Sequence, residues 1–156
     1  MEFKELLEKA TKGDANAQKE LGYYFEHGQD VEQDYKEAFK WYKKAALQEH
    51  IIAQFNLGLC YFNGRGVKEN LGEAANWFKK AALQGDAYAQ FLLGVCYEVR
   101  QNYKEAFNWY TKAFKLGLSD SKAFKELKDK LIEIYINGFG CKRNYDKAME
   151  IFQTTN

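Results

Sequence analysis

Proline is absent from this sequence, and histidine and cysteine are scarce. The 156 residues contain no proline, two histidines and three cysteines. A loop-rich fold or a β-sandwich normally uses proline at its turns, so its absence favours unbroken helices. An odd number of cysteines argues against a disulfide framework, and two histidines do not make a familiar zinc site. We therefore expect reduced thiols, no metal and no cofactor.

The sequence also lacks a long apolar run and an excess of charge of one sign. Nowhere do 18 apolar residues follow one another, and the opening MEFKELLEKATKGD carries acids and no apolar stretch of signal-peptide length. The 23 basic and 22 acidic side chains nearly cancel, so no overall field draws the protein to nucleic acid or to an anionic membrane. We expect a cytoplasmic protein without a membrane partner, with RNA binding left as an alternative.

What the sequence does contain is a repeat. The segment AQKELGYYFEHGQDVEQDYKEAFKWYKKAALQ, from Ala17, matches AQFNLGLCYFNGRGVKENLGEAANWFKKAALQ, from Ala53, position by position. A third copy starts at Ala89 with four residues fewer between its helices, and a degenerate fourth copy follows. The opening segment resembles the second helix of an incomplete unit. We predict one domain, with a capping helix over 1–14 and repeats over 15–50, 51–86, 87–118 and 119–156.

The apolar spacing within each repeat is helical. Ala53, Leu57 and Tyr61 fall on one face of a first helix, and glycines recur where a neighbouring helix must come close. One helical pair cannot bury both of its faces, so neighbouring pairs must stack. The pattern predicts an all-α fold, a right-handed α-solenoid of stacked antiparallel helix pairs with about nine helices. We expect the longer first helix of the fourth repeat to begin near Ser119 or Ser121 as its N-cap.

The motif A-Q-x-x-L-G-x-x-Y-x-x-G-x-G-V, followed by A-x-x-W-[FY]-x-K-A-A, is almost complete over residues 53–82. It resembles the Sel-one-like repeat (SLR), a subclass of the tetratricopeptide superfamily. Repeat 1 departs from it with Asp30 at the second loop glycine, and repeat 4 departs with Leu131-Ile132 for Leu-Gly. A secreted, cysteine-rich branch of that family pairs cysteines where this chain has Ala46 and Gln54, so its hydrolytic activity is disfavoured here.

The resemblance implies a scaffold that binds other proteins and carries no catalytic residues. We therefore expect an adaptor that binds a protein or peptide partner, rather than an enzyme. An immunity or regulatory protein that blocks a toxin or an enzyme is the alternative. Cys60 and Cys96 share one repeat position on the core side, where a buried structural thiol is the ordinary reading, and Cys141 at a loop end is the most exposed candidate.

The face of each first helix opposite the core is the predicted partner site, because in tetratricopeptide-like solenoids this stripe lines the concave groove. The predicted residues are Asn16, Lys19, Tyr23, Ile52, Phe55, Leu59, Phe62, Tyr88, Phe91, Val95, Glu98, Glu126, Asp129 and Glu133. The groove would be aromatic in its middle, mixed at one end and acidic at the other, and would suit an apolar segment with a basic end. Three alternatives stay open: tight superhelical curvature covers these residues, the long first helix of the fourth repeat folds back over them, or copies associate, for example as a homodimer through the C-terminal helix.

The stretch YFNGRGVKEN, residues 61–70, has the look of a phosphate loop but lacks the Lys-Ser/Thr ending and the preceding strand of one. We interpret it as a spacer. Gly64 and Gly66 supply backbone angles that side chains resist, and Asn70 caps the next helix.

Overall fold

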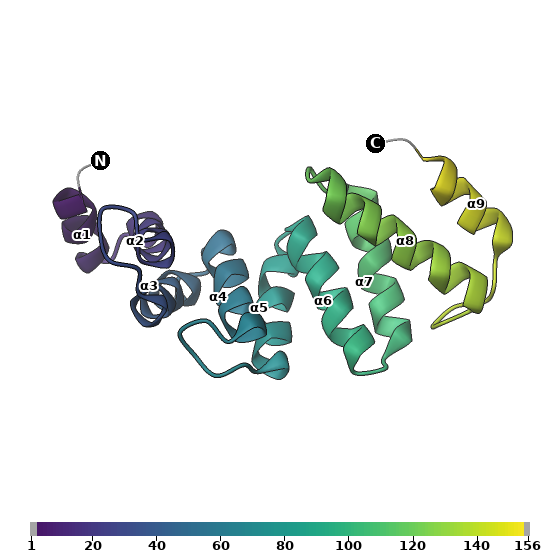
Figure 1. Cartoon of the computed structure of the whole chain (residues 1–156), viewed down its shortest axis with the longest axis horizontal. Helices are drawn as coiled ribbons and strands as arrows, with labels where there is room; N and C mark the ends of the chain where they lie inside the picture. The colour runs from purple at the N-terminus through teal and green to yellow at the C-terminus, as the bar shows by residue number, and fades with distance from the viewer. Residues whose placement is uncertain (1–2, 155–156) are drawn as a thin grey trace. The chain divides into compact units, whose positions relative to one another are not determined.

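The computed structural model describes residues 3–154, which form nine α-helices and no strand (Figure 1). The helices are α1 (Phe3–Thr11), α2 (Ala15–His27), α3 (Tyr35–Leu47), α4 (Ile51–Asn63), α5 (Leu71–Leu83), α6 (Ala87–Val99), α7 (Tyr103–Leu116), α8 (Ser121–Asn137) and α9 (Tyr145–Gln153). Residues 1–2 of the predicted capping helix and 155–156 of the predicted fourth repeat lie outside the described residues. The predicted all-α class is confirmed.

The helix boundaries follow from capping side chains and from glycines. Asn70 caps α5 by accepting hydrogen bonds from the amides of Gly72 and Glu73, as predicted. α4 ends at Gly64, whose φ of 67° lies in the left-handed region that glycine adopts easily. At α8 the predicted cap is wrong by one residue. Asp120, not Ser119 or Ser121, accepts from the Ala123 amide, which places a carboxylate at the positive end of the helix.

A glycine in the first helix of repeats 1, 2 and 3 lets the second helix approach. A Cβ built on Gly58 would lie 2.6 Å from two ring carbons of Phe78, and Gly22 and Gly94 meet the rings of Tyr42 and Tyr110 in the same way. All three rings are fully buried. The predicted close approach is therefore confirmed, and it takes place within a repeat.

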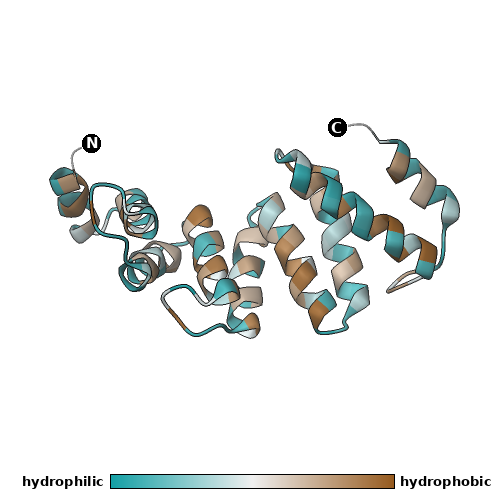
Figure 2. Cartoon of the chain, viewed as in Figure 1, coloured by the Kyte–Doolittle hydropathy of each residue, from teal (hydrophilic) through white to brown (hydrophobic). Residues whose placement is uncertain are grey.

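The chain divides into two compact units, one ending at Gln84 and one beginning at Gly85. Unit 1 holds α1 to α5 and has a core built on Leu21, Tyr42 and Leu57. Unit 2 holds α6 to α9 and has a core built on Tyr110 and Leu131. Figure 2 shows that hydrophobic residues are abundant along α4 and α6, the first helices of repeats 2 and 3.

The second loop glycine has a tertiary reason as well as a local one. Gly66 adopts a φ of 71°, and a Cβ on it would lie 1.9 Å from the carbonyl oxygen of Tyr35, in the first turn of α3. Gly140 in unit 2 meets the carbonyl of Tyr103 at 2.2 Å in the same way. The loop of one repeat thus lies directly on the backbone of the preceding repeat's second helix. Asp30, at the equivalent place in repeat 1, also has a positive φ, of 58°.

Candidate functional site

The predicted stripe is open to solvent in unit 1. Ile52 on α4 is 51% exposed and Tyr23 on α2 is 44% exposed, although both are large and apolar. Phe55, Leu59 and Phe62 are half-buried. The rings of Phe55 and Phe62 lie 5.9 and 6.1 Å from that of Phe78, so they are held in place by the core beneath them. The result is a supported apolar surface on α2 and α4.

Polar groups border this surface. Lys19 forms an ion pair with Glu20 at 2.8 Å, and Tyr23 stacks on His27 with ring centroids 4.0 Å apart. The exposed Asn16 bonds through its side-chain oxygen to Nε2 of His50 at 3.1 Å. At the predicted mixed end of the groove, each of these side chains therefore contacts another residue of the same unit.

In unit 2 the stripe is covered at Phe91, which corrects the sequence prediction for that residue. This ring is only 5% exposed and packs 5.8 Å from Tyr110, in a core that also holds Leu127 and Leu131 of α8. A side chain buried in this way does not face a partner. The long fourth-repeat helix covers it, as the alternative interpretation allowed. Val95 is half-buried against the same core.

Tyr88 likewise has a partner inside unit 2. Its hydroxyl accepts a hydrogen bond from the Asp120 amide at 2.7 Å and lies 3.2 Å from the Ser119 hydroxyl. Tyr88 therefore ties the start of α6 to the segment that leads into α8.

One position of the stripe holds a charged residue in some repeats and an apolar residue in another. In repeat 1, Glu26 accepts a hydrogen bond from the Tyr42 hydroxyl at 2.7 Å and forms an ion pair with Arg65 at 3.1 Å. In repeat 2, Phe62 and Phe78 hold the same two places. A glutamate on the first helix is therefore paired with a tyrosine on the second helix, and a phenylalanine on the first helix is paired with a phenylalanine on the second. Sequence reasoning missed this pairing, although comparing the repeats shows both changes together.

Repeat 3 again has a glutamate and a tyrosine at these two positions, Glu98 and Tyr110. Glu98 accepts from the Tyr110 hydroxyl and from Lys130 at 2.8 Å. Burial acts to raise the pKa of Glu98, but the hydrogen bonds from Lys130 and Tyr110 outweigh it, so the pKa is lowered. Burial, together with the adjacent carboxylate, raises the pKa of Tyr110. Glu98 is thus an ionised group whose two partners, Tyr110 and Lys130, both lie in its own unit.

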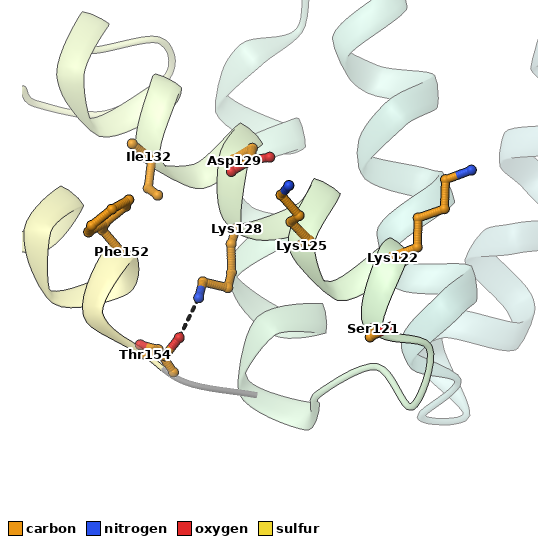
Figure 3. Close-up of a pocket in the computed structure, with 8 residues that line it drawn as sticks. All are labelled: Ser121, Lys122, Lys125, Lys128, Asp129, Ile132, Phe152 and Thr154. Atoms are coloured by element: carbon orange, nitrogen blue, oxygen red, sulfur yellow. Dashed lines mark hydrogen bonds between the residues drawn. The ribbon is translucent and has the colours of Figure 1, made fainter.

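The predicted acidic end, Glu126, Asp129 and Glu133 on α8, is exposed. Lysines accompany it. A hollow of about 580 Å³ between α8 and α9 is lined by Ser121, Lys122, Lys125, Lys128, Asp129, Ile132, Phe152 and Thr154 (Figure 3). Lys128 extends from α8 toward α9 and bonds to the Thr154 carbonyl. The spacing of three between these lysines was visible in the sequence, and it means that α8 offers charges of both signs.

The three cysteines are free thiols, two of them buried and one partly exposed. Burial raises the pKa of Cys60 to about 12 and that of Cys96 to about 11, so neither is a ready nucleophile. Cys141 is the most exposed of the three, and burial raises its pKa as well. Within residues 3–154, histidine, cysteine and carboxylate side chains nowhere gather in a group of three that could hold a metal ion.

Lysines of the second helices lie over tryptophans. Lys44 lies 3.9 Å from the ring centroid of Trp41, and Lys80 lies 4.1 Å from that of Trp77. These lysines help to cover the rings, which gives them a packing role. Among the described helices none is both long and apolar enough to cross a membrane.

Comparison with known proteins agrees with the repeat geometry. The family model described as Sel1 repeat matches residues 15–50, 51–86, 87–118 and 133–154. A crystal structure of a Sel1 repeat protein from Oxalobacter formigenes is 36% identical with a TM-score of 0.79, over 90% of this chain and 57% of that one. The c5321 protein, a protective antigen of uropathogenic Escherichia coli with an SLR fold, is 33% identical with a TM-score of 0.88, over 97% of this chain and 32% of that one.

MamA shares the fold, with a TM-score of 0.64 at 20% identity, over 93% of this chain and 78% of its own. No curated protein matches the chain. This chain spans 57% and 32% of the two SLR structures that it resembles at higher identity. Four matched repeats, an all-α solenoid fold and a glycine at each close helix approach lead to one conclusion: the chain belongs to the Sel1 repeat family.

Proposed function

We propose that this protein is an adaptor that binds a protein or peptide partner through the apolar surface of α2 and α4. The family is a non-catalytic repeat scaffold, and the proposal places no enzyme activity on this chain. The supporting observation is that Tyr23 and Ile52 are exposed, while Phe55 and Phe62 of the same stripe pack against the core ring of Phe78. Large apolar side chains that stay in water on a supported surface are typical of interaction sites, where such anchors supply most of the affinity.

The partner segment is apolar where it meets Ile52 and Phe55. The charged groups at the border of the surface are paired within the chain, as Lys19 with Glu20 and Glu26 with Arg65, so they set orientation more than affinity. A protein that blocks a toxin or another enzyme would use the same surface. We also propose a cytoplasmic location, because an odd number of cysteines fits a reducing compartment.

A second candidate is self-association through α9. Met149 and Phe152 are 54% and 68% exposed, whereas Ile151 between them is buried. A homodimer that joins these side chains would remove them from water. Light scattering coupled to size exclusion tests this proposal, since Phe152→Glu should convert a dimer to a monomer. A wild-type protein that is strictly monomeric at high concentration would remove the homodimer.

The partner surface is tested by Ile52→Glu. Half of the Ile52 side chain is already in water, so a carboxylate is tolerated in the free protein but is buried without a counter-ion in the complex. We expect capture of the partner from the native host to be lost, with the helical circular dichroism spectrum unchanged. Phe91→Glu is not suitable for this purpose, because it would unfold the core of unit 2.

Leu47→Glu is the matched control. Leu47 is 65% exposed at the end of α3, outside the proposed surface. This variant makes the same change of charge and should retain capture. If Ile52→Glu captures the partner as well as Leu47→Glu does, the α2 and α4 surface is not the binding site.

A further inference from the structure

The N-cap of α4 differs from those of its repeat equivalents. Asp14 and Asp86 stand at the same repeat position, one repeat before and one repeat after His50. Each aspartate accepts a short hydrogen bond from the amide three residues on, at 2.7 and 2.6 Å. His50 replaces the carboxylate with a ring nitrogen, and its Nδ1 accepts from the Ala53 amide at 3.3 Å. Repeat 2 is therefore capped by a group that can gain a proton near neutral pH.

The two contacts of the ring define its state. Nδ1 accepts a hydrogen bond, so it carries no proton, and the proton of the neutral ring is on Nε2. Nε2 lies 3.1 Å from the side-chain oxygen of Asn16 on α2, an atom that only accepts. The neutral ring satisfies both contacts and links the starts of α2 and α4. A protonated ring has an N–H at both nitrogens, so it loses the contact with Ala53 and keeps the one with Asn16.

The residue before His50 is a second departure from the repeat. Glu49 has a φ of 62°, whereas its equivalents are Gly13 and Gly85, with φ of 101° and 94°. A side chain in the left-handed region is strained unless its surroundings hold it there. The turn that leads into α4 thus combines a strained backbone with a titratable cap, and Ile52 of the proposed partner surface follows two residues later.

The charges around His50 favour the neutral ring. Across the contact with α2, Lys19 opposes protonation and Asp14 favours it, while Glu20 is paired with Lys19 and Glu49 is the neighbour in the turn itself. Burial is the largest cause that lowers the pKa of His50, followed by Lys19, whereas a hydrogen bond with the residue's own backbone and the charge of Asp14 act in the opposite direction. The positive end of the α4 dipole also disfavours a cation at this place.

We propose that His50 is a pH-sensitive cap: its protonation on acidification opens the first turn of α4 and disorders Ile52, which weakens the α2 and α4 surface. The link to partner binding rests on the proposed function, whereas the opening of the turn does not. The sign follows from the favoured neutral ring. The cap is complete above about pH 6.5, the ordinary pKa of histidine, and is lost as the pH falls through the lowered pKa of His50.

Amide hydrogen exchange tests the cap directly. Protection at Ala53, corrected for the intrinsic effect of pH on exchange, should fall by about fivefold between pH 7.5 and pH 5, the factor that corresponds to the loss of one N-cap. Ala17 and Ala89 are internal controls, because their caps are aspartates in place of the histidine. Protection at Ala53 that changes no more than at these two amides would overturn the proposal.

Two variants separate the cap from the rest of the fold. His50→Asp restores the cap used by the other repeats, so protection at Ala53 should be high and independent of pH. In His50→Ala, protection at Ala53 should be low at every pH. In the wild type the Ile52 methyl resonance should shift with the same midpoint as the Ala53 amide, and in His50→Asp it should not shift. An Ile52 signal that stays fixed while Ala53 opens would overturn the link between the cap and the surface.

None of these measurements needs a partner. Their failure is therefore distinct from the failure of the proposed function, which Ile52→Glu tests at a single pH with the cap intact.

Discussion

Replacing Gly66 by alanine tests whether the loop glycines are local turn residues or tertiary contacts. Gly64 and Gly66 have nearly equal φ angles, 67° and 71°, so alanine should cost both about 1 kcal/mol for the left-handed conformation. At Gly64 the new Cβ would have no neighbour within 3.4 Å. At Gly66 it would lie 1.9 Å from the Tyr35 carbonyl oxygen, a backbone atom that cannot rotate away. The loop must then shift, which adds about 2 kcal/mol, so we expect about 3 kcal/mol in total.

Urea unfolding followed by circular dichroism measures this difference. Gly64→Ala should lower the free energy of unfolding by about 1 kcal/mol and Gly66→Ala by about 3 kcal/mol, each with an unchanged slope. Gly140→Ala should behave like Gly66→Ala in unit 2, because its Cβ would meet the Tyr103 carbonyl at 2.2 Å. Equal effects of Gly64→Ala and Gly66→Ala would refute the argument and leave only the turn angle as the reason for the glycine.

Two further outcomes are expected. Tyr42→Phe removes a hydrogen bond to the Glu26 side chain and should lower the free energy of unfolding by about 1.5–3 kcal/mol, whereas Glu26→Phe with Tyr42→Phe reproduces the pair of repeat 2 and should recover most of it. A double variant no more stable than the single one in urea would contradict this coupling. Because hydrogen bonds hold the pKa of Glu98 below its ordinary 4.5, its contribution to stability is complete above pH 4.5 and is lost as the pH falls through the lowered pKa. Lys130→Met should make the loss of stability between pH 5 and pH 3 less steep, as urea midpoints across that range would show, and equal steepness would contradict the role of Lys130.

The helices and their ends could be predicted from the chain because their causes are local. The apolar period of each segment, the cap at Asn70 and the glycine at Gly64 act over a few residues, and they recur at the same repeat positions. Repetition itself supplied the fold class, because equivalent helix pairs with two apolar faces must stack. The prediction at the start of α8 failed by one residue, since serine and aspartate are both good caps and stand side by side there.

The exposure of the candidate site depended on tertiary structure. Phe55 and Phe91 occupy the same repeat position, and no local feature distinguishes them. Phe91 is buried because Leu127 and Leu131 of the longer α8 belong to the same core, whereas Phe55 is half-buried and lies beside the exposed Ile52. A helical wheel gives the direction of a side chain and not what lies opposite to it.

The sequence by itself determined the repeat, the helices and the family resemblance, because these depend on neighbours a few residues apart and on their recurrence. Tertiary structure decided which part of the stripe stays in water, why Gly66 must be glycine beyond its turn angle, and that His50 caps α4 while it contacts Asn16. Each of these three features depends on contacts between segments that are far apart in the sequence. Their distances are set by how the helices pack, and no pattern within one helix contains them.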